Sequence, residues 1–186
     1  MFTATSTEPV SSPNPETAIA PAGEWNPESR RNVSICDTQP VTAEGVRTLI
    51  DESGDLKFGP SVESLSEAAR VVAQMSPSVM VVDKAFGIQA ILDWLSGVRA
   101  SNTTGLDPLE TTGIVVWGGS ISEAEALRFL QAGARGILRK TAGVSTILAC
   151  LRTVAAGRSW MEDSVFRDSG RSERYPRSEL TVREQQ

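Results

Sequence analysis

Three charged residues follow directly on apolar segments that the sequence predicts to be β-strands. Asp37 follows "NVSIC", Asp83 follows "SVMVV", and Lys140 closes "GILRK". Two carboxylates and one ammonium at the same place could form an ion pair or a site for a charged ligand. A simpler interpretation of Asp83 is that it caps the next helix. The elements that position these residues decide between the interpretations.

Five predicted strands alternate with five predicted helices. Short apolar, β-branched runs predict strands, and apolar residues three and four positions apart predict helices. The strands are expected at 32–37, 56–62, 78–83, 113–117 and 136–140, and the helices at 40–50, 64–75, 86–100, 120–134 and 144–157. This alternation is typical of a parallel sheet with helices on both faces and right-handed crossovers. The sequence therefore predicts an α/β, doubly wound fold with five parallel strands.

Ligands of such open sheets gather at the carboxyl ends of the strands. That edge is expected to bring together Asp37, Asp83 and Lys140. Gly118 and Gly119, which follow the fourth strand, belong to the same edge. Their backbone N–H groups precede a helix and could contact an anion, although glycines in such a turn more often serve steric needs.

Other signals concern the ends of elements. The pairs Ser64–Glu67 and Ser120–Glu123 have the spacing of capping boxes. Trp117 ends the fourth strand and is expected to pack in the core, with a cover over the neighbouring site as the alternative. A polar loop is expected at 101–112.

The composition excludes several kinds of site. The 186 residues carry a net charge of −5, which argues against broad binding to phosphate backbones. The sequence includes no histidine, which excludes His-based zinc sites and Ser-His-Asp triads. Cys36 and Cys150 lie in apolar runs and are expected to be buried free thiols. No signal-peptide pattern or membrane-length apolar run occurs, so a cytoplasmic protein without membrane contact is expected.

The two ends of the chain differ in composition from the alternating region. Residues 1–31 are rich in Pro, Ser and Thr and are predicted to be a disordered tail, because they cannot bury enough apolar surface. A short helical extension is expected after Trp160, followed by a polar, charged linker at 161–178.

Residues 32–160 resemble the receiver domain of response regulators, above all the NarL/FixJ type, whose output domain is a LuxR-type helix-turn-helix. The matching stretches are "VSICDTQPVTAEGVRTLI", "SVMVVDKA", "IVVWGGSISEAEALRFLQAGARGILRKTAG" and "TVAAGRSW". The C-terminal "SELTVREQQ" is similar to the start of the family's DNA-binding domain, so 179–186 is predicted to be a stub of that domain. The resemblance implies a flavodoxin-like (CheY-like) sheet with strand order 2-1-3-4-5.

The resemblance also implies roles for residues at the predicted edge. In the family, the aspartate that matches Asp83 accepts a phosphoryl group from a histidine kinase, and the lysine that matches Lys140 neutralises the acyl phosphate. Phosphoryl transfer depends mostly on positioning and charge stabilisation. Asp37 and Asp83 would bind Mg²⁺. The affinity for Mg²⁺ should be weak, because Thr38 replaces the family's second acid, which binds the metal directly.

Three further positions depart from the family pattern. Gly118 stands where the family has a Ser or Thr that hydrogen-bonds to the phosphoryl group. The backbone of Gly118 and Gly119 could partly replace that contact. Ile137 stands at the position of the usual aromatic switch residue, and Gly87 at that of a common proline. Together these changes remove most of the relay that would read the phosphate.

Two functions therefore stay open, and neither makes the chain an enzyme. The first is a receiver domain that controls transcription in a two-component system, with Asp83 as phosphoacceptor and a histidine kinase as partner. The second is a degenerate receiver that acts without phosphate as a dimerisation or protein-interaction module, with Asp83 and Lys140 only paired. A nucleotide- or flavin-binding enzyme has no support, since neither GxGxxG nor a P-loop follows the first strand.

A homodimer is expected from the resemblance, because receivers often pair through the helix and strand that correspond to 120–132 and 136–140. Phe129 and Leu130 are candidate contacts, whereas a core stripe explains Leu127 and Leu130 equally well. DNA is expected to be contacted only through the C-terminal domain, because no recognition helix is included in this sequence.

Overall fold

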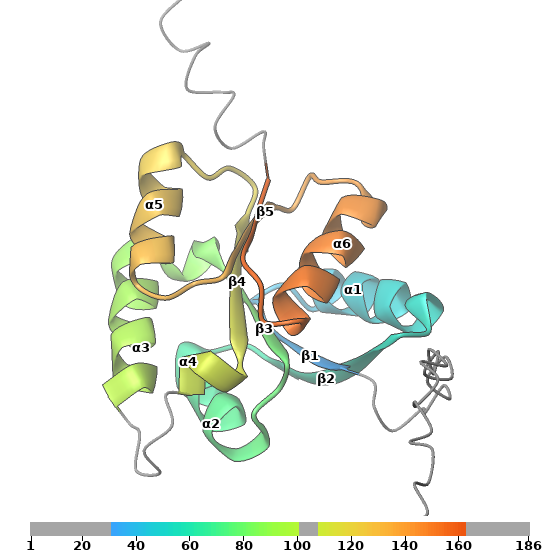
Figure 1. Ribbon diagram of the computed structural model, residues 1–186, viewed down its shortest axis with the longest axis horizontal. Coiled ribbons are helices and arrows are strands. Elements are labelled where there is room, and N and C mark those ends of the chain that lie inside the picture. Colours follow the sequence, from blue (N-terminus) through green and yellow to red (C-terminus); the bar gives the residue numbers. More distant parts are fainter. Residues whose placement is uncertain (1–30, 101–107, 163–186) are drawn as a thin grey trace, which may run out of the picture.

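The computed structural model describes residues 31–100 and 108–162 of the chain. Six parallel strands form one sheet in the order β2-β1-β3-β4-β5-β6 (Figure 1). The strands are β1 (Arg31–Cys36), β2 (Leu56–Val62), β3 (Val79–Asp83), β4 (Gly113–Gly118), β5 (Gly136–Arg139) and β6 (Trp160–Met161). The predicted order 2-1-3-4-5 is confirmed, and β6 is added beside β5.

Helices cover both faces of this sheet, as predicted. They are α1 (Pro40–Ser53), α2 (Leu65–Met75), α3 (Ile88–Ala100), α4 (Pro108–Thr111), α5 (Glu123–Gln131) and α6 (Val144–Ala155), with the short 3₁₀ helix η2 (Lys84–Phe86) after β3. One face carries α1 and α6, and the other carries α2, α3 and α5 (Figure 1). Across the described part of the chain, no helix is long and apolar enough to cross a lipid bilayer.

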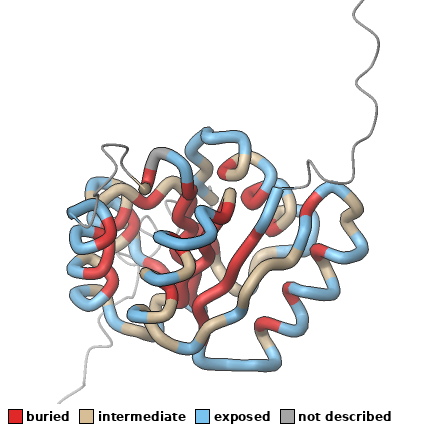
Figure 2. Tube along the Cα trace, turned by 90° about the horizontal axis from the view of Figure 1, so that it is seen from below, coloured by how far each residue is buried: buried red, intermediate tan, exposed pale blue. Residues whose placement is uncertain are grey.

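The two central strands are buried along their whole length (Figure 2). Successive side chains of a strand point to opposite faces, so Val81 and Val115 join the core under α1 and α6, while Val82 and Val116 join the core under α2, α3 and α5. Burying each of these side chains contributes about 1.5–3 kcal/mol. The continuous apolar run that precedes Asp83 therefore specifies a central strand, whose end Asp83 occupies.

The start of α5 differs from the prediction by two residues. Ser122 and Glu125 form the capping box, in place of Ser120 and Glu123. The segment "SISEAE" contains the Ser-x-x-Glu pattern twice, so the spacing alone could not select the right pair. Ser64 caps α2, as predicted, by accepting a hydrogen bond from the backbone N of Glu67.

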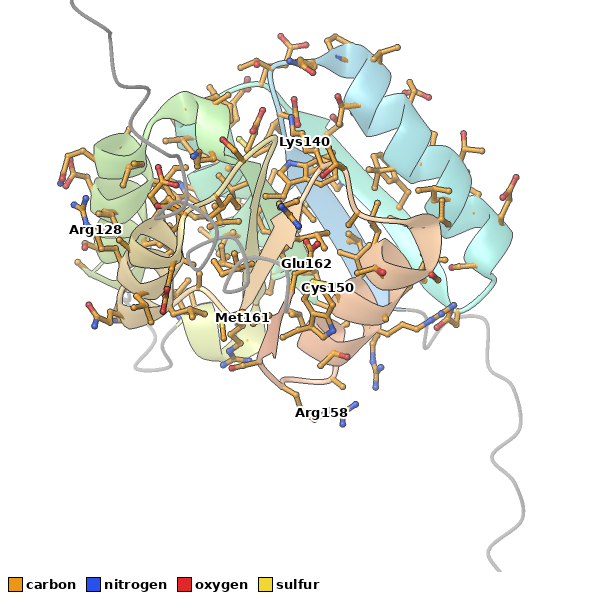
Figure 3. All side chains as sticks on the ribbon, turned by 90° about the horizontal axis from the view of Figure 1, so that it is seen from above. Arg128, Lys140, Cys150, Arg158, Met161 and Glu162 are labelled. Carbon is orange, nitrogen blue, oxygen red and sulfur yellow. The ribbon has the colours of Figure 1, made fainter. Side chains whose placement is uncertain are left out.

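Two further predictions about the elements are wrong. The segment expected to be a loop before β4 contains the short helix α4. Met161, where the predicted helical extension after Trp160 would begin, lies in the strand β6, and the rest of that extension from residue 163 lies outside the described residues. A hydrogen bond from Glu162 N to Ile137 O and another from Arg139 N to Glu162 Oε2 hold this end of the chain. Met161 and Glu162 follow this edge of the sheet in Figure 3. A two-residue strand is too short to show a periodicity in the sequence.

Residues 1–30 of the predicted tail, residues 163–178 of the predicted linker and the predicted stub at 179–186 lie outside the described residues. Arg31, the last residue of the predicted tail, is the first residue of β1.

Candidate functional site

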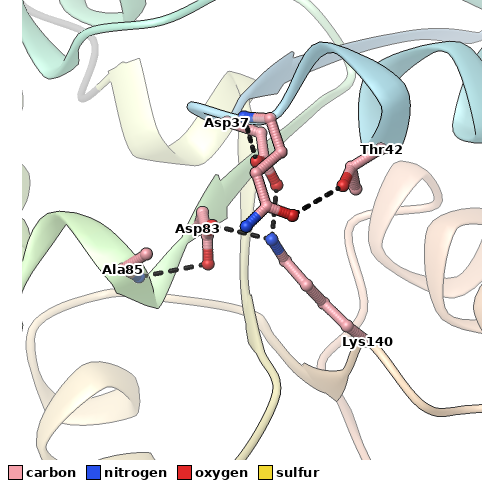
Figure 4. A network of polar contacts seen from close by, with 6 residues as sticks. Asp37, Thr42, Asp83, Ala85 and Lys140 are labelled. Carbon is pink, nitrogen blue, oxygen red and sulfur yellow. Dashed lines mark hydrogen bonds and ion pairs between the residues drawn. The ribbon is translucent and has the colours of Figure 1, made fainter.

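The three charged residues at the strand ends meet at one point. Lys140, directly after β5, donates hydrogen bonds from Nζ to Asp37 Oδ2 and to Asp83 Oδ2, each over 2.7 Å (Figure 4). These contacts join residues that are 103 and 57 positions apart in the chain. The predicted convergence at the carboxyl edge of the sheet is confirmed.

Each carboxylate also holds the backbone that follows it. Asp37 Oδ1 accepts a hydrogen bond from Gln39 N over 2.9 Å, just before α1 begins. Asp83 Oδ1 accepts one from Ala85 N over 3.1 Å and so caps η2. The capping interpretation of Asp83 is therefore right, and the ion pair is present as well, because one oxygen caps the next turn and the other contacts Lys140.

Burial makes this ion-pair cluster different from a surface salt bridge. The side chains of Asp37 and Asp83 are 0% and 3% exposed, and that of Lys140 is 19% exposed. Burial by itself would lower the pKa of Lys140, but the hydrogen bonds from its ammonium to Asp37 and Asp83 outweigh burial and raise the pKa. Lys140 therefore stays charged at neutral pH.

Trp117 packs directly beneath the cluster. It is buried, as predicted, and Lys140 Nζ lies 5.2 Å from the centroid of its ring. At this distance the ring face attracts the ammonium. Trp117 thus packs in the core and also helps to hold Lys140 in position.

A second ion pair borders the first. Lys84 Nζ donates to Oε1 and Oε2 of Glu125 over 3.1 and 3.0 Å, and the two side chains are 21% and 22% exposed. Glu125 Oε2 also accepts from Ser122 N over 2.8 Å. Burial would raise the pKa of Glu125, but the hydrogen bonds from Ser122 and Lys84 lower it overall. Sequence reasoning missed this pair, although a lysine directly after Asp83 was a signal.

An open pocket of about 400 Å³ lies beside Asp83. Its lining includes two lysines, one aspartate and the glycine turn after β4. The lining residues are Gln39, Asp83, Lys84, Ala85, Gly118, Gly119, Ser120 and Lys140. The structure therefore places Gly118 and Gly119 in the same pocket as Asp83 and Lys140.

The two glycines have different surroundings. A Cβ atom at Gly118 would lie 3.0 Å from Lys84 Cβ, whereas a Cβ atom at Gly119 would meet nothing within 4 Å. Lys84 thus fills the space in which a Ser or Thr side chain at position 118 would begin. Close approach of a neighbouring side chain explains Gly118 and leaves Gly119 unexplained.

The residues at this edge do not match the requirements of Mg²⁺. That ion needs a tight octahedron of oxygen ligands, but the two carboxylates already share the ammonium of Lys140, and Thr38 is exposed beside them. Among residues 31–100 and 108–162, no group of three or more His, Cys, Asp or Glu side chains could hold a metal ion. The positive charge of this cluster comes from Lys140.

The structure also tests predictions made for residues away from the edge. Phe129 is fully buried, so it is wrong as an exposed dimer contact, and Leu127 is exposed, so it is wrong as a core residue. Leu130 is partly buried against the core.

Cys36 and Cys150 are buried free thiols, as predicted, and burial is the main cause that raises the pKa of each to about 12.

No protein-family model matches the chain. The nitrate/nitrite response regulator protein homolog of Haemophilus influenzae is 26% identical over 138 residues, which are 74% of this chain and 63% of that protein. A LuxR-family two-component response regulator from Aurantimonas sp. has a TM-score of 0.63 at 22% identity, over 78% of this chain and 100% of that one. The chain has the fold of a response-regulator receiver domain.

A second solved structure supports this receiver fold. The signal receiver domain of the putative response regulator NarL from Mycobacterium tuberculosis has a TM-score of 0.53 at 19% identity, over 69% of this chain and 98% of that one. The predicted resemblance is confirmed as a likeness to NarL- and LuxR-family response regulators. The chain spans less than two thirds of the length of the curated relative that it matches.

Proposed function

We propose that this chain contains the receiver domain of a two-component response regulator that controls transcription, and that Asp83 is its phosphoacceptor. The receiver fold supports the first part. One observation carries the second: Asp83 borders an open pocket while its Oδ2 is 2.7 Å from the ammonium of Lys140. This arrangement combines a nucleophile, a cation and room for a phosphoryl group.

The proposed reaction uses groups that are already in position. A carboxylate oxygen of Asp83 attacks the phosphorus of the donor, and the bond between phosphorus and the leaving group breaks, so that its electron pair departs with the leaving group. An acyl phosphate forms on Asp83. Ala85 N orients the carboxylate, and Lys140 Nζ stabilises the phosphoryl oxygens by charge and hydrogen bonding. In the cell, a histidine kinase would be the donor.

The partners follow from the same proposal. The regulator would act in the cytoplasm, where a kinase can reach Asp83. It would contact DNA through a LuxR-type domain. Residues 179–186 resemble the first residues of such a domain. Dimerisation of the receiver would bring two such domains together.

A specific observation favours a second candidate function, in which the receiver works without phosphate as a dimerisation or interaction module. Both oxygens of Asp37 and both of Asp83 already accept hydrogen bonds. Together with Lys140, these carboxylates carry one net negative charge, so a phosphoryl group would add to an existing excess. Thr38 and Gly118 also supply neither the acid nor the hydroxyl of the family pattern.

Labelling with acetyl phosphate distinguishes the two candidates. We expect the wild-type chain to gain one phosphoryl group, measured by intact mass and located on Asp83 by peptide mapping, in buffers with and without Mg²⁺. Asp83→Asn should gain none. Asp93→Asn, which removes an exposed acid on α3, is the matched control and should label like wild type. A wild-type chain that stays unlabelled would exclude Asp83 as phosphoacceptor, and an unchanged dimer fraction in Asp83→Asn would then support the second candidate.

A further inference from the structure

Lys84 lies where the receiver pattern places a hydroxyl side chain. Its Cβ would be 3.0 Å from a Cβ at position 118, so its stem fills the space above Gly118. Lys84 and Lys140 line the same pocket. The pocket is therefore lined by two lysines from different elements, η2 and the turn after β5.

Glu125 holds the second ammonium at the start of α5. Lys84 lines the pocket while its ammonium contacts Glu125. Because its four-carbon stem is flexible, rotation of the stem can turn the ammonium from Glu125 toward the pocket. Glu125 would keep its hydrogen bond from Ser122 N after losing Lys84. It also lies in the first turn of α5, where the helix N-terminus favours a negative charge. These two features reduce the cost of releasing Lys84.

We propose that Lys84 is a second cationic ligand for a phosphoryl-type anion in this pocket, and that Glu125 holds Lys84 while the anion is absent. The proposal rests on the proposed function, because phosphorylation of Asp83 would bring such a group into the pocket. A phosphoryl group carries about two negative charges and Glu125 carries one, so the ammonium is drawn toward the phosphoryl group. Occupation of the pocket would thus be coupled to the amino end of α5.

Two substitutions should have opposite effects. Lys84→Met keeps the stem and removes the charge, so the rate constant for labelling of Asp83 by acetyl phosphate should fall about tenfold through loss of a charge-assisted hydrogen bond. Glu125→Gln preserves the capping box, since Gln can accept from Ser122 N, but weakens the hold on Lys84, and labelling should become about threefold faster. The double variant should behave like Lys84→Met.

Lys57→Met is the matched control, because Lys57 is an exposed lysine on β2 that does not line this pocket. It should label at the wild-type rate. A Lys84→Met variant that labels as fast as wild type, a Glu125→Gln variant that labels more slowly, or a control that loses as much as Lys84→Met would each overturn the proposal.

Titration with inorganic phosphate separates this proposal from the phosphoacceptor function. Binding is followed by the NMR shifts of the backbone amides of Gly119 and Ser120 in the folded 186-residue chain. If wild type is not labelled but binds phosphate, with weaker binding in Lys84→Met and tighter binding in Glu125→Gln, the phosphoacceptor function fails and the role of Lys84 stands. If phosphate does not bind, or binds equally to all variants, the role of Lys84 fails whatever the labelling shows.

Discussion

Two regions of this domain contain ion pairs of nearly the same length in very different surroundings. At the carboxyl edge of the sheet, Lys140 Nζ is 2.7 Å from an oxygen of Asp37 and of Asp83. On the surface, Arg152 of α6 contacts Asp55, which directly precedes β2, through two hydrogen bonds of 2.7 and 2.8 Å. The side chains of the surface pair are 44% and 49% exposed, whereas those of the two edge carboxylates are almost fully buried.

This difference shows that the length of an ion pair says little about its energetic importance. Water and salt screen the Arg152–Asp55 pair, and either partner remains hydrated if the other is lost. At the edge, the loss of Lys140 would leave two neighbouring buried carboxylates without a counter-charge. Burial therefore determines which of the two regions the fold depends on.

The largest predicted effect is that of Lys140→Met. We expect the free energy of unfolding, from chemical denaturation at neutral pH, to fall by about 3–5 kcal/mol, because two buried charges lose their partner. Adding Asp37→Asn and Asp83→Asn to this variant should restore much of the loss by removing those charges. A loss no larger than that of Arg152→Met would contradict the comparison, and so would a triple variant less stable than Lys140→Met.

Sequence reasoning could predict the edge cluster because it depends on topology alone. Alternating strand and helix signals specify a parallel sheet, and the carboxyl ends of parallel strands share an edge. Any side chain at a strand end is thereby placed to within one residue. The prediction that Asp37, Asp83 and Lys140 lie together required no knowledge of helix packing or rotation. Their burial and exact contacts could be known only from the structure.

The Lys84–Glu125 pair could not be predicted in this way. It depends on where α5 begins, and the two overlapping Ser-x-x-Glu patterns left that start uncertain by two residues. On a helix, two residues are about 200° of rotation. The rotation of α5 also determines which of its side chains face the core: Leu127 is exposed and Phe129 is buried, the reverse of their predicted roles.

A smaller effect is expected within the edge itself, where packed and open positions adjoin. Gly118→Ser should lower the free energy of unfolding by about 1–2 kcal/mol, because the new Cβ meets Lys84 Cβ at 3.0 Å. Gly119→Ser, the matched control at an open position, should change it by less than about 0.5 kcal/mol. Thermal or chemical denaturation measures both changes.

A double-mutant cycle then tests the cause of the Gly118 effect. Lys84→Gly removes the Cβ atom that the new side chain would meet, so Gly118→Ser should be less destabilising in the Lys84→Gly background than in wild type. Equal losses in both backgrounds would show that contact with Lys84 Cβ does not explain the glycine at position 118. A Gly119→Ser variant as unstable as Gly118→Ser would contradict the distinction between the packed and open positions of this edge.

The smallest effect is expected for Arg152→Met. The hydrogen bond from Arg152 is the main cause that lowers the pKa of Asp55 below its ordinary value of 3.8. A carboxylate with a lowered folded-state pKa contributes stability that is present above the unfolded-state pKa and is lost as the pH falls through the folded-state value. The contribution of an exposed pair should be about 0.5 kcal/mol at pH 7. The difference in unfolding free energy between wild type and Arg152→Met should therefore shrink below pH 3.8 and in high salt. If this difference in unfolding free energy stayed constant under both conditions, the lost stability would come from packing of the Arg152 stem on the surface of α6. The two regions would then differ in side-chain packing and not in the strength of their charge interactions.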